Sequence, residues 1–471
     1  MTTDRGSQYQ ALPAVGDTLQ QPFAKLLIER FGRDQVVRWI RTAQATIRQR
    51  ITDGECRCDR DTLQRMLQDL VHDLAGQLTQ HRLRWVINAT GVLLHTGLGR
   101  APLSRSAAAA ALEAAQSCNL EVDLESGERR QRGYQLEDAW RTLTGAEAAF
   151  VVNNNAAATL LALQALCAGR EVIISRGQLI EIGGSFRLPE IFALSGTLLR
   201  EVGTTNHTRL SDYERAITPA TAAILHVHPS NYRIVGFADT PGIVPLTKLA
   251  QHHGLLSIDD IGSGCLSPLD ILREFPAEPS FQESLEAGAD LVLGSGDKLL
   301  GGPQCGILLG REQIVNQIRQ HPLARAVRID KLTLAALAGT LDSYLQGRAQ
   351  QEIPLLQMLS VTSDTLRNRA TSIRNQLPAL RYLSLDLLET TSPVGGGTLP
   401  AVELPTLCLV LNHASLSSEE LSRQLRLGTP AIMGRCQFDR VLLDLRSVLP
   451  DDDNQIVEGL RQLDQKSHGH V

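Results

Sequence analysis

The 471-residue sequence has few aromatic residues and no long apolar stretch. Phe, Trp and Tyr make up 4% of it, and no run of about 18 apolar residues occurs, so no membrane-spanning helix is predicted. The opening residues, MTTDRGSQYQALPAV, have no apolar core behind a basic start, so no secretory signal is predicted either. We therefore expect a protein of the cytoplasm.

The sequence also lacks a regular cysteine pattern and any excess of positive charge. Its eight cysteines are scattered, and without an export signal we expect reduced thiols. Cys56 and Cys58 are too close together for the usual zinc knuckle, and no second pair follows, so no metal site is expected. The net charge of −5 excludes a chain that is basic overall, but it does not exclude a local basic surface.

The hydrophobic pattern divides the chain into three regions. Residues 1–85 repeat apolar residues at helical spacing and are predicted to form a helical N-terminal domain. Residues 86–340 alternate short β-rich runs with helical stretches, which is typical of an α/β catalytic domain. Residues 341–471 are predicted to contain linking helices and a small α+β C-terminal domain.

Seven short apolar runs in the middle region are the predicted strands. Their alternation with helical segments indicates a mostly parallel seven-stranded sheet covered on both faces. Because such sheets bind ligands at the carboxyl ends of their strands, the polar residues directly after the strands are the first candidates for a site. The predicted strands span residues 149–152, 171–176, 197–202, 222–228, 255–260, 290–296 and 305–310.

The segment LVLGSGDKLLGGPQCGILLG, residues 291–310, is the most distinctive local feature. A lysine at the mouth of a parallel sheet, beside small residues that allow close approach, suits Schiff-base chemistry, and Lys298 has this position. Ser295, three residues earlier, could bind a phosphate that the lysine also approaches. Taken alone, the pattern also fits a surface lysine in a glycine-rich turn.

Two further segments supply what a pyridoxal cofactor needs. LLSIDDIGSGCL, residues 255–266, offers an acid for the pyridinium nitrogen: Asp260 is the first choice and Asp259 the alternative. VVNNNAAATLLAL, residues 151–163, offers a helix start for the phosphate, and its candidates are Asn153, Asn154 and Asn155. These acids and asparagines could also be simple helix caps. Loop, acid and lysine nevertheless follow the order expected of a fold-type I pyridoxal-phosphate enzyme.

Longer motifs give a specific resemblance. From about residue 10 to about 465 the sequence resembles bacterial selenocysteine synthases, the L-seryl-tRNA(Sec) selenium transferases. The resemblance implies a fold-type I enzyme that uses pyridoxal 5′-phosphate to convert seryl-tRNA(Sec) to selenocysteinyl-tRNA(Sec), through an aminoacrylyl intermediate, with selenophosphate as selenium donor. Gly97, Gln178 and Pro229 depart from the usual Asn, Glu and Thr of the family. The motifs include INATGVLLHTGLGRAPLS (87–104), EVGTTNHT (201–208), SNYRIVGF (230–237), GSGDKLLGGPQCGI (294–307) and HPLARAVRIDKLTLAAL (321–337).

The resemblance also implies roles for three arginines and for the N-terminal domain. Arg100, Arg325 and Arg328 match family positions implicated in donor binding, and an arginine fork suits phosphate. Arg325 and Arg328 are predicted to share one face of a helix. The N-terminal domain is implied to recognise tRNA, and seven basic residues against two acidic ones between 24 and 50 suit phosphate contacts. These are Lys25, Arg30, Arg33, Arg38, Arg41, Arg48 and Arg50.

Two other functions remain open. One is a pyridoxal-phosphate β-eliminating lyase for a small amino-acid substrate, and the other is an RNA-binding protein with a degenerate enzyme domain. The helical N-terminal region and the arginines favour the selenium transferase, and the intact lysine, acid and phosphate loop argue against a degenerate domain. The resemblance further implies a homo-oligomer, a decamer built as a pentamer of dimers, with active sites at subunit interfaces. His226 and His228 are interpreted as packing or hydrogen-bonding residues.

Overall fold

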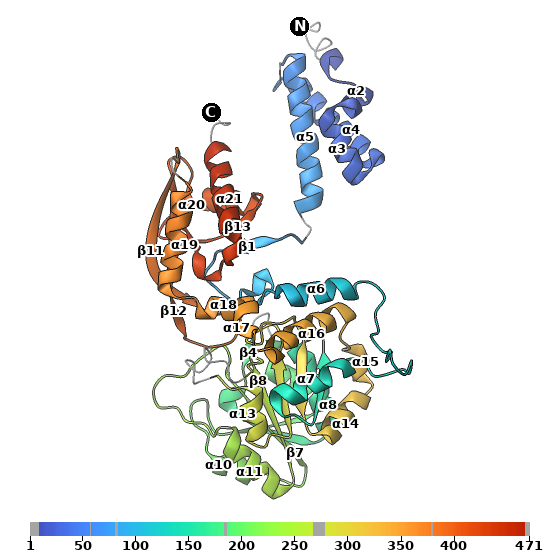
Figure 1. The fold of residues 1–471 in the computed structure, drawn as a ribbon, viewed down its shortest axis with the longest axis vertical. Coiled ribbons are helices and arrows are strands. Elements are labelled where there is room, and N and C mark those ends of the chain that lie inside the picture. Colours follow the sequence, from blue (N-terminus) through green and yellow to red (C-terminus); the bar gives the residue numbers. More distant parts are fainter. Residues whose placement is uncertain are drawn as a thin grey trace. The chain divides into compact units, whose positions relative to one another are not determined.

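A computed structural model describes residues 9–56, 58–80, 83–182, 186–266, 278–377 and 380–466. The chain forms two compact units, Met1–Trp85 and Val86–Val471, which Figure 1 colours from blue to red along the sequence. Within the described residues, no helix combines the length and the apolar character needed to cross a membrane.

The first unit is helical because its apolar residues recur with the helical period. Val36, Ile40 and Ile47 of the 21-residue helix α4 are fully buried along one face. Gly32 separates α3 from α4 with a φ of 81°, and Gly54 ends α4 in the left-handed conformation. The helices are α2 (Val15–Gln20), α3 (Pro22–Phe31), α4 (Arg33–Asp53) and α5 (Arg60–Gln80).

Seven strands of the second unit form a central sheet in the order β2-β10-β9-β8-β7-β3-β6. The five strands from β9 to β6 run parallel to one another, and β10 is antiparallel to both β2 and β9. The predicted mostly parallel seven-stranded sheet is therefore confirmed. Its strands are β2 (Ala148–Val152), β3 (Glu171–Ser175), β6 (Leu198–Val202), β7 (Thr221–Val227), β8 (Leu256–Gly262), β9 (Leu291–Ser295) and β10 (Gly306–Gly310).

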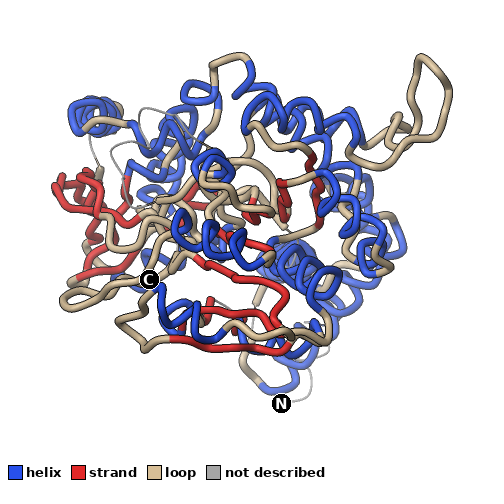
Figure 2. Tube along the Cα trace, turned by 90° about the horizontal axis from the view of Figure 1, so that it is seen from below, coloured by secondary structure: helices blue, strands red, loops and turns tan. Residues whose placement is uncertain are grey.

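Helices cover this sheet on both faces (Figures 1 and 2). Val152 and Leu293 enter one apolar core while their neighbours Val151 and Val292 enter another, because successive side chains of a strand point to opposite faces. A short hairpin, β4 (Glu181–Ile182) and β5 (Phe186–Arg187), precedes α9. The helices of this part are α6 (Arg105–Ala114), α7 (Glu137–Thr144), α8 (Asn155–Cys167), α9 (Leu188–Ser195), α10 (Leu210–Ala216), α11 (Ile243–His253), α13 (Phe281–Glu286), α14 (Glu312–Gln320), α15 (Leu323–Ala326) and α16 (Lys331–Leu345).

The C-terminal part is an α+β structure around the antiparallel sheet β11-β12-β15-β14. β1 at the start of the unit pairs in parallel with β13 near its end, so the two ends of the unit are joined. Helix α16 runs through the boundary predicted at 340/341. The elements are α17 (Ala349–Glu352), α18 (Pro354–Ser360), α19 (Ser363–Asn375), α20 (Ser418–Leu427), α21 (Asp453–Lys466), β1 (Val86–Asn88), β11 (Leu383–Pro393), β12 (Glu403–His413), β13 (Ala431–Met433), β14 (Arg435–Gln437) and β15 (Arg440–Asp444).

Helices α16 and α6 approach each other closely at Gly339. A Cβ atom at this position would lie 2.8 Å from the Cα of Ala107. Gly339→Ala should therefore lower the free energy of unfolding by about 1–3 kcal/mol, although alanine is the better helix former. Asp342→Ala, at an exposed position of the same helix, should change it by less than about 0.5 kcal/mol. Urea denaturation measures both, and unchanged stability of Gly339→Ala would contradict the close approach.

Candidate active site

A cavity of about 230 Å³ lies at the carboxyl ends of β7, β8 and β9. Val227 and Ser295 end β7 and β9, Asp260 lies near the end of β8, and all three line the cavity. Lys298 enters it from the turn after β9. This is the edge at which parallel sheets bind ligands. We call the space the lysine cavity.

The carboxyl group of Asp260 is held from two directions. The Nδ2 of Asn155 donates to Oδ1 at 2.9 Å, and the Oγ1 of Thr159 donates to Oδ2 at 3.0 Å. The backbone N–H of Gly262 also donates to Oδ1, at 3.1 Å. Burial raises the pKa of this carboxyl, whereas these hydrogen bonds and the charge of Lys298 act in the opposite direction. Asp260 is thus a fixed, buried acid beside the lysine.

Asp259 lies on the opposite face of β8. Its Oδ1 is 2.8 Å from the Nδ1 of His226, and its Oδ2 accepts a hydrogen bond from the Oγ of Ser284 at 2.6 Å. Because neighbouring residues of a strand point to opposite faces, only one of the two acids can enter the lysine cavity, and that acid is Asp260.

Lys298 is 3% exposed, and its Nζ donates to the carbonyl oxygen of Gly397 at 3.3 Å. Burial lowers the pKa of its amine, and the nearby charge of Arg100 lowers it further. A Cβ atom at Gly262 would lie 4.0 Å from this nitrogen, and one at Gly397 would lie 3.8 Å from it. These two glycines leave room around the lysine nitrogen.

Arg100, for which the resemblance implies a role in donor binding, also lines the lysine cavity. Its NH1 donates to the Oδ2 of Asp297 at 2.8 Å, and its backbone has a φ of 61°. A positive φ is uncommon outside glycine. The ion pair with the residue next to Lys298 therefore fixes one cation at the cavity.

Helix α8 begins at the wall of the lysine cavity. Asn154 is its N-cap, and its side chain accepts from the backbone N–H of Ala157 at 2.8 Å. Asn154, Asn155 and the small residue Ala156 line the cavity. Asn153, predicted with them, is exposed and lies outside the lining. Two of the three predicted asparagines therefore lie at the helix start that lines the cavity, a position at which proteins commonly bind anions.

Arg325 and Arg328 lie elsewhere within the chain. They line a separate cavity of about 470 Å³, where Arg328 is 3.5 Å from the Oε1 of Glu121. The prediction that they share one helix face is wrong, because α15 ends at Ala326 and Arg328 forms a β-bridge with Val152. Four further arginines line this cavity: Arg129, Arg130, Arg132 and Arg319.

The predicted RNA-binding residues of the N-terminal unit are exposed. Lys25 and Arg30 lie on α3, and the other five lie on α4. The apolar residues of these helices pack into a common core, so the cations remain at the solvent-facing surface. The five predicted RNA-binding residues on α4 are Arg33, Arg38, Arg41, Arg48 and Arg50.

The sequence reasoning missed several polar residues of the lysine cavity, among them Thr159, Gln304, His228 and Ser230. His228 and Ser230 both line it, directly after β7. The Nε2 of His228 is 3.5 Å from the Oε2 of Glu278 and has no hydrogen-bond partner among the described residues. The position of His228 and Ser230 after a strand end was the available signal, but the sequence does not show which side chains turn into the cavity.

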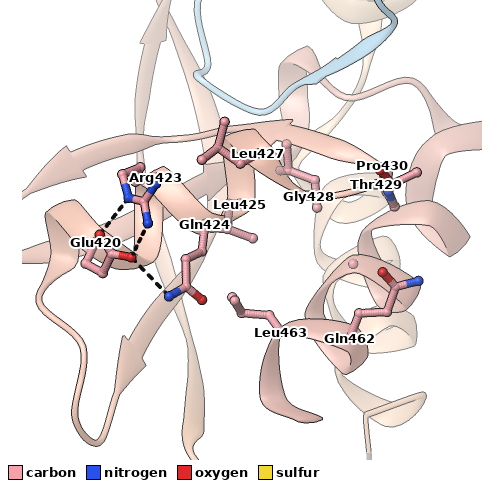
Figure 3. Close-up of a pocket in the computed structure, with 12 residues that line it drawn as sticks. Glu420, Arg423, Gln424, Leu425, Leu427, Gly428, Thr429, Pro430, Gln462 and Leu463 are labelled. Carbon is pink, nitrogen blue, oxygen red and sulfur yellow. Dashed lines mark hydrogen bonds and ion pairs between the residues drawn. The ribbon is translucent and has the colours of Figure 1, made fainter. Parts of the chain in front are cut away.

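A different cavity, of about 480 Å³, lies in the C-terminal part (Figure 3). Its two charged residues neutralise each other, because Arg423 donates to Glu420 at 2.8 Å. Leu425, Leu427 and Leu463 supply much of the remaining lining. The described residues that line this cavity include no lysine and no unpaired charged side chain, unlike those of the lysine cavity.

Comparison with known proteins agrees with this geometry. Residues 86–449 match the family model described as L-seryl-tRNA selenium transferase, and residues 9–48 match that of the selenocysteine synthase N terminus. The chain belongs to the L-seryl-tRNA selenium transferase family. The L-seryl-tRNA(Sec) selenium transferase of Moorella thermoacetica is 46% identical over 97% of each chain. That of Aquifex aeolicus is 43% identical over 91% of this chain and 94% of the relative.

The fold of this selenium transferase family member also occurs in other enzymes. A solved structure of D-glucosaminate-6-phosphate ammonia-lyase covers 83% of this chain and 98% of its own, with a TM-score of 0.56. At 23% identity the similarity shows the fold alone. The predicted fold-type I α/β class is thereby confirmed.

At position 178 the chain has a glutamine where the selenium transferase family usually has a glutamate, and this glutamine makes a hydrogen bond in the structure. The buried Gln178 accepts a hydrogen bond through Oε1 from the backbone N–H of Val227 at 3.3 Å. A neutral amide satisfies this buried N–H at the end of β7 without the cost of burying a charge. Gln178 can therefore replace the usual glutamate at this position.

The lowered pKa of Lys298 gives a labelling prediction. Treatment with pyridoxal phosphate and then borohydride should modify Lys298, and its labelling should persist to lower pH than that of the exposed Lys248. Arg100→Gln removes a cation and leaves Asp297 unpaired, so it should raise the pKa of Lys298 and shift labelling to higher pH. Peptide mass spectrometry across a pH series measures both, and equal pH profiles for the two lysines would refute the assignment.

Proposed function

We propose that this chain converts seryl-tRNA(Sec) to selenocysteinyl-tRNA(Sec), with pyridoxal 5′-phosphate as cofactor and selenophosphate as selenium donor. The observation that carries the proposal is the lysine cavity, in which Lys298, Asp260 and the start of α8 meet at one sheet edge. Membership of the selenium transferase family names the reaction.

The residues of the lysine cavity fit the cofactor. The α8 start, with Asn154 and Asn155, suits its phosphate, and Ser295 adds a hydroxyl at the same cavity. Asp260 suits the pyridinium nitrogen, because a buried acid with a raised pKa can share a proton with it. The amine of Lys298 suits the aldehyde carbon of the cofactor. When bound, pyridoxal phosphate supplies an electron sink for the α-carbon of the substrate.

The chain's own groups move the protons. The amine of Lys298 accepts the α-proton of the seryl group, and burial, which lowers the pKa of this amine, favours the uncharged form that a base requires. Asp260 lines the same cavity and would hold the proton on the ring nitrogen of the cofactor. Both side chains are buried, which strengthens the electrostatic interaction between them.

Binding of the selenophosphate donor requires cations. Arg100 stands at the lysine cavity, and Arg325 and Arg328 bind selenophosphate from a second copy of the chain. This arrangement requires an active site at a subunit interface, in agreement with the proposed decamer of five dimers. It also explains why two arginines of a donor site line a different cavity of their own chain.

Replacing Arg325 or Arg328 should impair the transfer of selenium much more than the removal of the seryl α-proton. With seryl-tRNA(Sec) and labelled selenophosphate, the intact protein should form labelled selenocysteinyl-tRNA(Sec). Arg325→Ala or Arg328→Ala should lower that yield about ten- to a hundredfold, because charge-assisted contacts are worth roughly 1.5–3 kcal/mol each. Tritium exchange at the seryl α-carbon should fall much less, because it needs no donor. Equal loss of both signals would contradict a role in donor binding, and exchange without transfer in the intact protein would indicate a lyase.

The N-terminal cations should bind the RNA through its phosphates. Replacing Arg33, Arg38 and Arg41 by Gln should weaken seryl-tRNA(Sec) binding and make its salt dependence shallower, because fewer counterions are released. The absorbance of bound pyridoxal phosphate should not change. Arg65→Gln, at an exposed site of α5, is the matched control. Filter binding at several salt concentrations measures the slope, and an unchanged slope in the triple variant would contradict the assignment.

A further inference from the structure

A second cavity adjoins the lysine cavity. Its volume is about 520 Å³, and it shares the side chain of His228 with the lysine cavity. The turn after β7 forms the common wall: Ser230 faces the lysine cavity, while Pro229 and Tyr232 line the second one. Small-molecule sites have roughly this size, about 300–1,000 Å³. We call the second space the outer cavity.

The walls of the outer cavity combine apolar and planar groups. Ile234, Leu399 and Val402 provide apolar surface, and His226 and Tyr232 provide rings. Tyr232 is fixed because its hydroxyl donates to the backbone oxygen of Gly177. Proteins bind unpaired nucleobases between such rings, apolar side chains and arginine planes. The lining therefore suits a flat, partly polar ligand.

Some polar atoms of the residues that line the outer cavity remain free to form hydrogen bonds with that ligand. Gln178 uses Oε1 to accept from Val227, which leaves its NH₂ group, and Asn206 uses Nδ2 to donate to the backbone oxygen of Phe237 at 2.7 Å, which leaves Oδ1. Arg233 lines the cavity, and within the described part of the chain it has no hydrogen bond or ion pair. One amide donor, one amide acceptor and one guanidinium can thus bind the edge, the face or the ribose of a nucleoside.

The position of the outer cavity identifies which nucleoside reaches it. In an aminoacyl-tRNA the amino acid is an ester of the terminal adenosine, so the ribose lies one ester bond from the seryl group. A seryl group at Lys298 requires that this adenosine occupy the space next to the lysine cavity. Resting on the proposed function, we propose that the outer cavity binds the terminal adenosine of the seryl-tRNA, with Arg233 against its base.

The test uses the holoenzyme and two stable probes, 3′-serylamino-3′-deoxyadenosine and serinamide. The nucleoside probe should bind at least about tenfold more tightly, because stacking of one base contributes about this much. Arg233→Ala should remove most of the difference, and Ala238→Trp, which adds a bulky side chain at an exposed lining position, should do the same by occlusion. Serinamide affinity should not change. Arg200→Ala, at an exposed arginine of β6 outside the cavity, should leave both affinities as they are.

Two results would overturn the assignment. Equal affinity of the parent protein for both probes would mean that no nucleoside subsite exists. A preference for the nucleoside probe that survives both Arg233→Ala and Ala238→Trp would place the subsite elsewhere. Failure of the proposed function gives a different result, because the parent holoenzyme would then form no selenocysteinyl-tRNA(Sec) from seryl-tRNA(Sec) and selenophosphate.

Discussion

The hydrogen bonds to the carboxyl group of Asp260 are the constraint on which the site depends. A carboxylate at this depth is costly unless it is paired, and Asn155, Thr159 and the N–H of Gly262 supply the pairing. Because Asn155 and Thr159 belong to α8, the same bonds fix the start of that helix against the end of β8. The acid and the start of α8 are therefore held by one network, and Lys298 lines the same cavity as both.

The pleat of β8 separates two acids that are neighbours in the sequence. Asp260 shares a cavity with Lys298, whereas Asp259 is held by His226 and Ser284 on the other face. Such a separation lets one carboxyl face the lysine while the other joins β8 to β7 and α13 behind it. Exchanging their roles would require a one-residue shift of the strand, which would also turn its apolar residues outward.

The sequence predicted the elements that depend on local pattern. The seven strands and the meeting of Lys298 with Asp260 follow from apolar runs and from the rule that strand ends meet at one edge. Contacts between distant segments could not be read in this way. Arg328 forms a β-bridge instead of continuing a helix, and His228 turns into the lysine cavity because of the path of the chain after β7. Both depend on tertiary packing, which leaves no periodic signal.

The bond from Lys298 to Gly397 links the lysine to the loop between β11 and β12, more than ninety residues away in the chain. The carbonyl oxygen of Gly397 accepts this hydrogen bond only while the Nζ of Lys298 points toward it. When the nitrogen engages another group, the carbonyl oxygen of Gly397 loses this donor. The lysine is in this way tied to the C-terminal sheet, and a ligand that engages its nitrogen competes directly with the carbonyl of Gly397.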